Sequence, residues 1–205
     1  AYSIAPFIYT RPLEQIRNDV CFHRLPVVLV GNGGGYAYGV MGPSHHALED
    51  YGVLSTLPEM RCHIPCFAED LSPLVDSLMT STTPSYLRLG RDEKPTGWIP
   101  PAYAPWRRLT DGQGPLLVAV GPLAGLYLAP ILAMDASHRP KLWAAAEFPL
   151  SIAPPPSDFW QDLASSRTLV VAEEHVAQGG FGEALASLCL REGRAPGRFL
   201  HASAK

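Results

Sequence analysis

The sequence has little charge of either sign and no excess that would attract a polyanion. Its 205 residues include 16 Lys and Arg against 19 Asp and Glu, a formal net charge of −3 at pH 7. A broad basic surface is what draws proteins to phosphate backbones and to anionic lipid. We therefore expect no nucleic acid and no membrane as partner, while the 47% hydrophobic content suffices for a packed core.

Cysteine is also scarce, and the four that occur, Cys21, Cys62, Cys66 and Cys189, lack the spacing of a disulfide framework. Cys62 and Cys66 flank His63, but a structural zinc site needs a second pair of ligands at motif spacing, which the sequence lacks. No Gly-x-Ser-x-Gly elbow of a serine hydrolase occurs, and no secretory leader opens the sequence. We expect no metal site on this chain and a cytoplasmic location.

Charge is missing altogether between residues 112 and 134, a stretch long enough to cross a bilayer. Gly121-Pro122 and Pro130 interrupt it. A buried strand, a Gly-Pro turn and a helix that begins near the proline explain the pattern at least as well as a membrane span. We therefore favour two elements of a globular domain.

What the sequence does contain is an alternation of apolar strands and amphipathic helices. Residues 25–30 form an unbroken apolar run, and 70–79 place their apolar side chains on one helical face. Continuous apolar strands between helices are typical of parallel sheets covered on both faces. The predicted fold class is α/β, with strands at 25–30, 62–67, 86–89, 115–120, 141–147, 168–173 and 198–202 and helices at 11–24, 45–57, 70–79, 122–134, 158–164 and 180–191.

The alternation is interrupted once, at residues 93–113, where prolines and aromatic residues replace the periodic pattern. We interpret this stretch as a linker that lies on a surface. It divides the chain into two consecutive small domains, 1–92 and 114–205, each a mostly parallel sheet with helices on both faces. Because the first unit yields only a small sheet, we expect another segment to precede or complete it.

A glycine-rich loop at residues 31–39 follows the first predicted strand. Backbone N–H groups of glycines at the carboxyl end of a strand can approach a ligand closely. The loop is not a dinucleotide fingerprint, since the third glycine would stand at position 36, which is Tyr36, and it lacks the Lys-Ser/Thr of a phosphate loop. It is either a flexible turn or a ligand-binding loop.

Two adjacent histidines, His45 and His46, come directly after Gly42-Pro43-Ser44, which predicts the cap of the helix at 45–57. The positive end of a helix disfavours imidazolium, so these rings would be neutral and able to exchange a proton at neutral pH. One of the two would merely pack or cap. The nearby glycine loop favours a functional role for His45.

Two other sets of polar residues fall at predicted strand ends. Arg88 and Arg91 close the first unit at the end of the strand at 86–89, where either Arg91 holds an anionic substrate or the two arginines form a solvated surface pair. Glu173 and Glu174 precede the Gly179-Gly180 pair at the start of a helix, and helix-entry chemistry is the first interpretation there.

Taken together, these segments resemble a known family. Leu13-Glu-Gln-Ile-Arg-Asn-Asp-Val20, the glycine loop and Gly42-Pro-Ser-His45 resemble the pyrimidine-binding domain of transketolases and of the related deoxyxylulose-phosphate synthases. Leu169-Val-Val-Ala-Glu-Glu-His175 with Gly179-Gly-Phe-Gly182 is similar to the C-terminal domain of that family. The resemblance implies a thiamine-diphosphate enzyme, in which this domain meets a diphosphate-binding domain of another protomer.

The resemblance also implies roles for individual residues. Phe7 and Tyr2 match the aromatic region that packs against the aminopyrimidine of the cofactor. His45 matches the histidine that faces the hydroxyls of the donor sugar, so it is the implied catalytic and substrate-binding residue. Arg91 matches a substrate-phosphate contact, and Gly33 stands where many members present another histidine to the substrate.

Two parts of the family pattern have no counterpart in this sequence. The glutamate that activates the cofactor lies upstream of the Tyr2-Ser3 segment in the family, and the domain that carries the Mg²⁺ motif is absent. We therefore predict the smaller half of a split enzyme. Its partner, an N-terminal transketolase-like subunit, would bring the diphosphate-binding domain and the Mg²⁺ ligands in an α2β2 hetero-oligomer.

The predicted function is transfer of a two-carbon ketol unit between small-molecule substrates. Gly33, where the family often has a histidine, favours an unusual substrate over the common pentose phosphates, and Met41 is a second departure, since the family often has an acidic residue there. Three alternatives stay open: a deoxyxylulose-phosphate-synthase-like enzyme, a 2-oxo-acid decarboxylating component and a non-catalytic assembly module.

Overall fold

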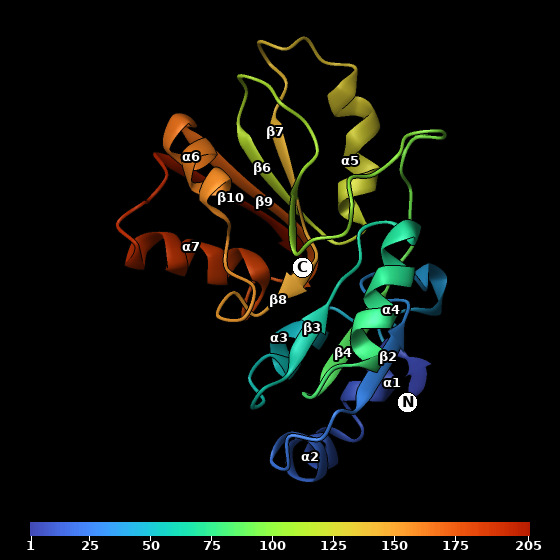
Figure 1. Ribbon diagram of the computed structural model, residues 1–205. Coiled ribbons are helices and arrows are strands. Elements are labelled where there is room, and N and C mark those ends of the chain that lie inside the picture. The colour runs from blue at the N-terminus through green and yellow to red at the C-terminus, as the bar shows by residue number, and fades with distance from the viewer.

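The computed structural model describes residues 1–205 and contains two five-stranded sheets, one built mainly from each half of the chain (Figure 1). The strands are β1 (Tyr2–Ile4), β2 (Val28–Asn32), β3 (Arg61–His63), β4 (Ser85–Leu89), β5 (Trp106–Arg108), β6 (Leu116–Val120), β7 (Lys141–Ala145), β8 (Glu147–Phe148), β9 (Thr168–Val176) and β10 (Arg198–Ala204). The α-helices are α1 (Ala5–Tyr9), α2 (Leu13–Gln15), α3 (Asp50–Leu54), α4 (Leu71–Met79), α5 (Leu123–Leu132), α6 (Ser157–Ser165) and α7 (Phe181–Arg191). A π-helix at Ile16–Cys21 continues α2, and short 3₁₀ turns lie at Gly39–Met41 and Ala68–Asp70.

The first sheet has the order β1-β2-β4-β3-β8, in which β1 to β4 are parallel and β8 is antiparallel to β3. Helix α4 covers one face, where its Leu74 and Leu78 pack with Leu87 of β4. On the other face Tyr51 of α3 shares a core with Leu29 of β2. Both faces of these strands are therefore apolar, as the unbroken hydrophobic runs predict.

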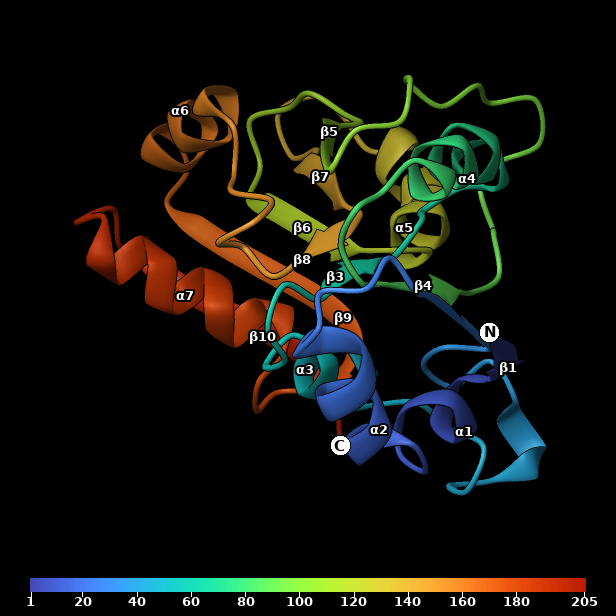
Figure 2. The same cartoon turned by 60° about the horizontal axis from the view of Figure 1, so that its bottom comes forward.

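The second sheet has the order β10-β9-β6-β7-β5, with only β5 antiparallel to its neighbour. Helix α5 lies on one side of it, and α6 and α7 lie on the other (Figures 1 and 2). Leu142 and Ala144 pack on the α5 side, whereas Leu116 and Val118 belong to the core on the α6 and α7 side. The predicted α/β class, with two mostly parallel sheets and helices on both faces, is confirmed.

The sequence analysis does not predict some of the short elements. Strand β1 and helix α1 occupy residues 2–9, too few for a periodic signal to appear. Strand β5 lies inside the stretch 93–113 that we interpret as a linker, and it forms an edge of the second sheet by pairing with β7. The single strand predicted at 141–147 is two strands, β7 and β8, which belong to different sheets. The domain boundaries at 92 and 114 stay a prediction.

The two halves of the molecule interlock. Strand β8, from the second half of the chain, adds the fifth strand to the first sheet. In the opposite direction, Arg107 of β5 donates to Asp70 at the start of α4, with Nη2 and Oδ2 2.6 Å apart in a buried pair. The largest hydrophobic core cluster includes Leu29 from the first sheet and Leu169 from the second. The halves therefore share one core.

The uncharged stretch at 112–134 forms β6, a turn at Gly121 with φ +60°, and the ten-residue helix α5. No helix in the structure combines the length and the apolar character that crossing a membrane requires.

Candidate functional site

The glycine loop leaves the carboxyl end of β2 and is tied directly to the neighbouring strand. The backbone N–H groups of Gly33 and Gly34 donate to the Leu89 carbonyl at 3.0 and 2.9 Å. Gly33 has φ +73°, and a Cβ at this position would run into the Tyr38 ring. Glycine is therefore required here by both the backbone and the close approach of Tyr38, and the loop is a built turn at the ligand-binding end of a parallel sheet.

His45 lies in a cluster of aromatic rings that this loop brings together. Its ring meets the Phe7 ring edge-on at a centroid distance of 5.3 Å, and the Tyr38 ring at 5.8 Å. The Ser44 hydroxyl lies 3.0 Å from Nδ1 of His45. With Nδ1 engaged, Nε2 is the nitrogen left to meet a ligand. The structure thus unites two of the predicted site residues, Phe7 and His45, beside Gly33.

The predicted helix start at His45 is wrong. Helix α3 begins at Asp50, and His45 lies in a turn five residues earlier. The cause is the antiparallel bridge between Ala47 and Gly35, which holds the chain extended beyond the histidines. His45 is therefore placed by ring packing and does not stand at the start of α3.

His46 has a bracing role in the same loop. Its Nε2 lies 3.0 Å from the Gly39 carbonyl, and its ring packs edge-on against Tyr36 with centroids 5.1 Å apart. This is the packing function that the sequence analysis expects of one of the two histidines. The loop is thereby folded back on itself, so that its two histidines face different groups.

Tyr2 lies apart from this cluster. It sits in the edge strand β1 opposite Val30 of β2, with 68% of its surface exposed. Tyr38, a residue of the glycine loop to which the sequence analysis assigns no role, packs beside His45 and accepts a hydrogen bond from the Asn32 amide at 3.0 Å. Its contact with His45 is visible only in the folded loop, because the sequence does not show which ring the loop turns toward the histidine.

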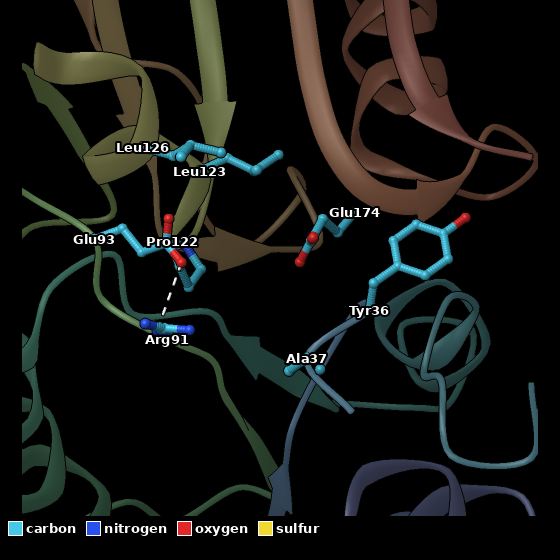
Figure 3. A pocket seen from close by; sticks show the side chains of 9 residues that line it. Tyr36, Ala37, Arg91, Glu93, Pro122, Leu123, Leu126 and Glu174 are labelled. Atoms are coloured by element: carbon cyan, nitrogen blue, oxygen red, sulfur yellow. Dashed lines mark ion pairs between the residues drawn. The ribbon is translucent and has the colours of Figure 1, made fainter. Parts of the chain in front are cut away.

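Arg91 lines a cavity of about 240 Å³ between the two halves of the molecule (Figure 3). His45 and Phe7 are not among the residues that line this cavity. Its guanidinium Nε lies 3.5 Å from Glu93, and 85% of its side chain is exposed. Glu174 at the end of β9 faces the same space, and burial raises the pKa of this carboxyl. The remaining lining residues are Gly34, Tyr36, Ala37, Pro122, Leu123 and Leu126.

Arg88, the other arginine of this strand end, is no surface residue. It is 4% exposed and pairs with the fully buried Asp50, with Nε and Oδ2 2.8 Å apart. Tyr86 donates to the same carboxylate oxygen at 2.7 Å, and the burial of Tyr86 beside this charge raises the pKa of its hydroxyl well above the usual value. Tyr86 and Arg88 are two residues apart in β4, so their side chains lie on the same face of the strand. This spacing is the one feature of the sequence that indicates their shared hydrogen bonding to Asp50.

Glu173 confirms the helix-entry interpretation. Its carboxylate accepts the backbone N–H groups of Phe181 and Gly182 at 2.7 and 2.8 Å, where α7 begins, and it also accepts hydrogen bonds from Tyr51 and His201. Burial by itself would raise the pKa of Glu173, but these donors outweigh it and hold the pKa below its usual value. This buried carboxylate joins α3, α7 and β10.

The cysteines form no reactive or metal-binding group. All four are buried and free, and burial raises the pKa of Cys66 to about 12. No group of three His, Cys, Asp or Glu side chains lies close enough together to hold a metal ion.

Comparison with known proteins shows which families this chain is similar to. Residues 4–96 match the family described as the transketolase pyrimidine binding domain. A subunit of apulose-4-phosphate transketolase from Phocaeicola vulgatus is 40% identical over 91 residues, which are 44% of this chain and 29% of that protein. 1-Deoxy-D-xylulose-5-phosphate synthase from Myxococcus xanthus is 29% identical over 192 residues, 89% of this chain and 31% of that protein.

Among solved structures, a split-gene transketolase described as an inactive β4 tetramer superposes with a TM-score of 0.79 at 26% identity, over 100% of this chain and 66% of that one. Residues 4–96 therefore match the pyrimidine binding domain of transketolases, and the whole chain is similar in fold to the split-gene transketolase. The chain spans less than a third of the length of these two curated relatives.

Proposed function

We propose that this chain is the small subunit of a thiamine-diphosphate-dependent enzyme that transfers a two-carbon ketol unit. The observation that carries the proposal is the placement of His45. Its ring is held by Phe7 and Tyr38 at the carboxyl end of a parallel sheet, with Nε2 free to meet a substrate hydroxyl. A histidine so placed orients a polyhydroxyl substrate and takes up or returns a proton.

The aromatic wall fits one half of a thiamine site. When bound, thiamine diphosphate supplies the carbon that accepts the ketol fragment and the electron sink for its cleavage. Phe7 is half-buried and would line the aminopyrimidine ring, with Tyr2 as a second candidate at the exposed edge. This chain offers no cluster of three metal-ligating side chains, and the proposal assigns the Mg²⁺ and diphosphate contacts to a partner subunit.

The substrate would extend from His45 along the glycine loop. Gly33 brings no side chain to the substrate at the position where a second histidine would otherwise meet the sugar, and the Tyr38 ring lies against it. Arg91, on the far side of the loop, would bind an anionic substituent through its exposed guanidinium. Glu93 already neutralises part of that charge, so the anion must compete with a carboxylate.

A partner that carries the diphosphate-binding domain would complete the site by covering the loop tip. Val40 and Met41 project there as apolar side chains with relative exposures of 103% and 56%. Exposed apolar side chains next to a half-formed site are typical of a docking surface. The split-gene relative is inactive as a β4 tetramer. This supports the need for a partner subunit, and the assembly that we propose contains two such chains and two partner subunits.

The test is reconstitution with the partner subunit from the same host. We expect native mass spectrometry to show an α2β2 complex that holds thiamine diphosphate and Mg²⁺, and the complex to transfer a ketol unit from a ketose donor. His45→Gln should lower kcat by about 10²-fold, the lower range for loss of a positioned proton donor. His46→Gln, which alters only the bracing ring, is the matched control. Assembly without ketol transfer would contradict the proposal.

A second function is favoured by the relatives that match both domains. The Myxococcus synthase aligns over 89% of this chain, whereas the apulose-4-phosphate transketolase relative aligns over 44%. A synthase reaction would couple decarboxylation of a 2-oxo acid to carbon–carbon bond formation. The reconstituted complex separates the two functions: release of CO₂ from pyruvate with an aldehyde acceptor supports the synthase, and transfer from a ketose without CO₂ supports the transketolase.

A further inference from the structure

Arg88 forms the centre of a buried network that joins three separate segments. Its Nε donates to Asp50 at the start of α3 at 2.8 Å. Its Nη2 donates to two backbone carbonyls, that of Ala47 at 2.9 Å and that of Glu174 at 2.8 Å. The guanidinium also lies over the Tyr51 ring, 5.2 Å from its centroid. A single side chain thus bonds the His45 loop, a helix of the first domain and a strand of the second.

The two carbonyl acceptors stand next to groups of the candidate site. Ala47 follows His45 by two residues and pairs with Gly35 of the glycine loop. Gly34 lies directly on Arg88, because a Cβ at this position would run into the arginine side chain. Glu174 lines the cavity that Arg91 faces. Arg88 itself is 4% exposed, so its effect on a substrate must pass through these neighbours.

The geometry points to Arg88 as a positioning residue that fixes the His45 loop, the glycine loop and the second domain relative to one another. The inference rests on the proposed function in one respect, that His45 meets the substrate. A planar guanidinium presents its N–H groups in fixed directions, which suits three acceptors on three segments. Its bonds to the carbonyls of Glu174 and Ala47 link the second domain, which lies outside the His45 cluster, to the loop that carries His45.

The substitution that tests this is Arg88→Lys. Lysine keeps a positive charge opposite Asp50, but a compact ammonium on a flexible chain cannot reproduce the planar fork that reaches both carbonyls. Arg107→Lys is the matched control, since Arg107 forms the other buried Arg–Asp pair and its side chain is remote from the His45 loop in its contacts. Circular dichroism establishes that each variant is folded.

The first readout is the His45 ring signal in the NMR spectrum of the chain alone, assigned with His45→Gln. Because the Phe7 and Tyr38 rings pack against His45, their ring currents make this signal a reporter of its position. We expect it to move by more than a line width in Arg88→Lys and to stay in place in Arg107→Lys. An unchanged signal in folded Arg88→Lys, or an equal shift in both variants, would overturn the inference.

The second readout is kinetic and uses the reconstituted complex. Because misplacement of a reacting group by about 1 Å costs as much as 10²-fold, we expect kcat to fall by at least about 10-fold in Arg88→Lys. KM should change far less, and Arg107→Lys should retain wild-type kcat. A raised KM with unchanged kcat would count against a positioning role.

The two readouts separate failure of this inference from failure of the proposed function. If the wild-type complex transfers no ketol unit, the proposed function fails, and the NMR comparison still decides the role of Arg88. If Arg88→Lys does not fold, Asp50→Asn replaces it, since the amide has the shape of the carboxylate but weakens the anchor of Arg88. If the His45 ring signal then keeps its wild-type position in Asp50→Asn, the inference is overturned.

Discussion

Glu173 retains its charge inside the protein because four donors from three elements point at it. Its carboxylate is fully buried and accepts two backbone N–H groups, the Tyr51 hydroxyl and the His201 ring. Charge-assisted hydrogen bonds to an ion in a low-dielectric interior are among the stronger polar interactions in proteins. The pKa of Glu173 is therefore lower in the folded chain than in the unfolded one, so this residue couples stability to pH.

Replacing Glu173 with Gln should destabilise the protein in a pH-dependent manner. A lowered folded-state pKa contributes stability above the unfolded-state value of about 4.3, and this contribution is lost as the pH falls through the folded-state pKa. We expect Glu173→Gln to cost about 3 kcal/mol at pH 7 and progressively less below about pH 4. Urea unfolding at a series of pH values measures this. Glu183→Gln, an exposed carboxylate of the same helix turn, is the control, and a difference that is constant with pH would contradict the prediction.

Arg91 allows a test of substrate binding without a loss of stability. Since 85% of its side chain is exposed, Arg91→Gln should change the free energy of unfolding by less than about 0.5 kcal/mol. If Arg91 holds an anionic substituent, KM for a phosphorylated substrate should rise about 10-fold or more, the effect of losing a charged hydrogen bond. Arg24→Gln, which breaks another exposed ion pair with Glu59, is the control. An unchanged KM would leave Arg91 as a solvated surface residue.

At the scale of elements, helix α3 shows how the contact between the halves constrains a local sequence. Alanine normally stabilises a helix interior relative to glycine by about 1 kcal/mol. Gly52 departs from this rule because it lies against the second half of the molecule. A Cβ there would come within 2.7 Å of the His175 ring and 2.9 Å of the Gly179 carbonyl, and the Gly52 N–H donates to Nε2 of His175 at 3.1 Å.

We therefore predict that Gly52→Ala destabilises the chain, by about 1–3 kcal/mol, as expected for overpacking. The cause is tested by a double-mutant cycle in which His175→Ala removes the obstructing ring. Gly52→Ala should cost less in that background than in the wild type. Chemical denaturation of the four proteins gives the coupling energy, and additive effects would show that His175 is not the obstacle.

At the scale of the whole molecule, the two sheets are joined by buried structure. Strand β8 from the second half completes the first sheet, the buried Arg107–Asp70 pair crosses the boundary, and one core cluster contains residues of both sheets. A boundary crossed by so much buried structure leaves neither half with a closed core of its own.

Heating should therefore produce one cooperative unfolding transition. We expect differential scanning calorimetry to give a single peak whose calorimetric and van't Hoff enthalpies agree. Arg107→Met leaves Asp70 as a buried charge without its partner, so it should lower the midpoint of the whole transition. Two resolved peaks, or a shift confined to one of them, would show that the halves unfold independently.

Local patterns along the chain were enough to predict the α/β class and most elements of both sheets, and they pointed to the glycine and histidine residues of the candidate site. Hydrophobic periodicity is a local property, so it identifies elements such as α4 and β6 without knowledge of their neighbours. The motif around Gly42-Pro43-Ser44-His45 is equally local, because it lies within one contiguous segment.

How these pieces meet follows from contacts that no local pattern contains. Helix α3 begins at Asp50 and not at His45, because Ala47 pairs with Gly35 in a bridge between two loops. Strand β8 joins the sheet of the other half, and Arg88 is buried because Asp50 and two distant carbonyls converge on it. These features depend on residues far apart in the chain, whose interaction energies outweigh local propensity and leave no periodic trace in the sequence.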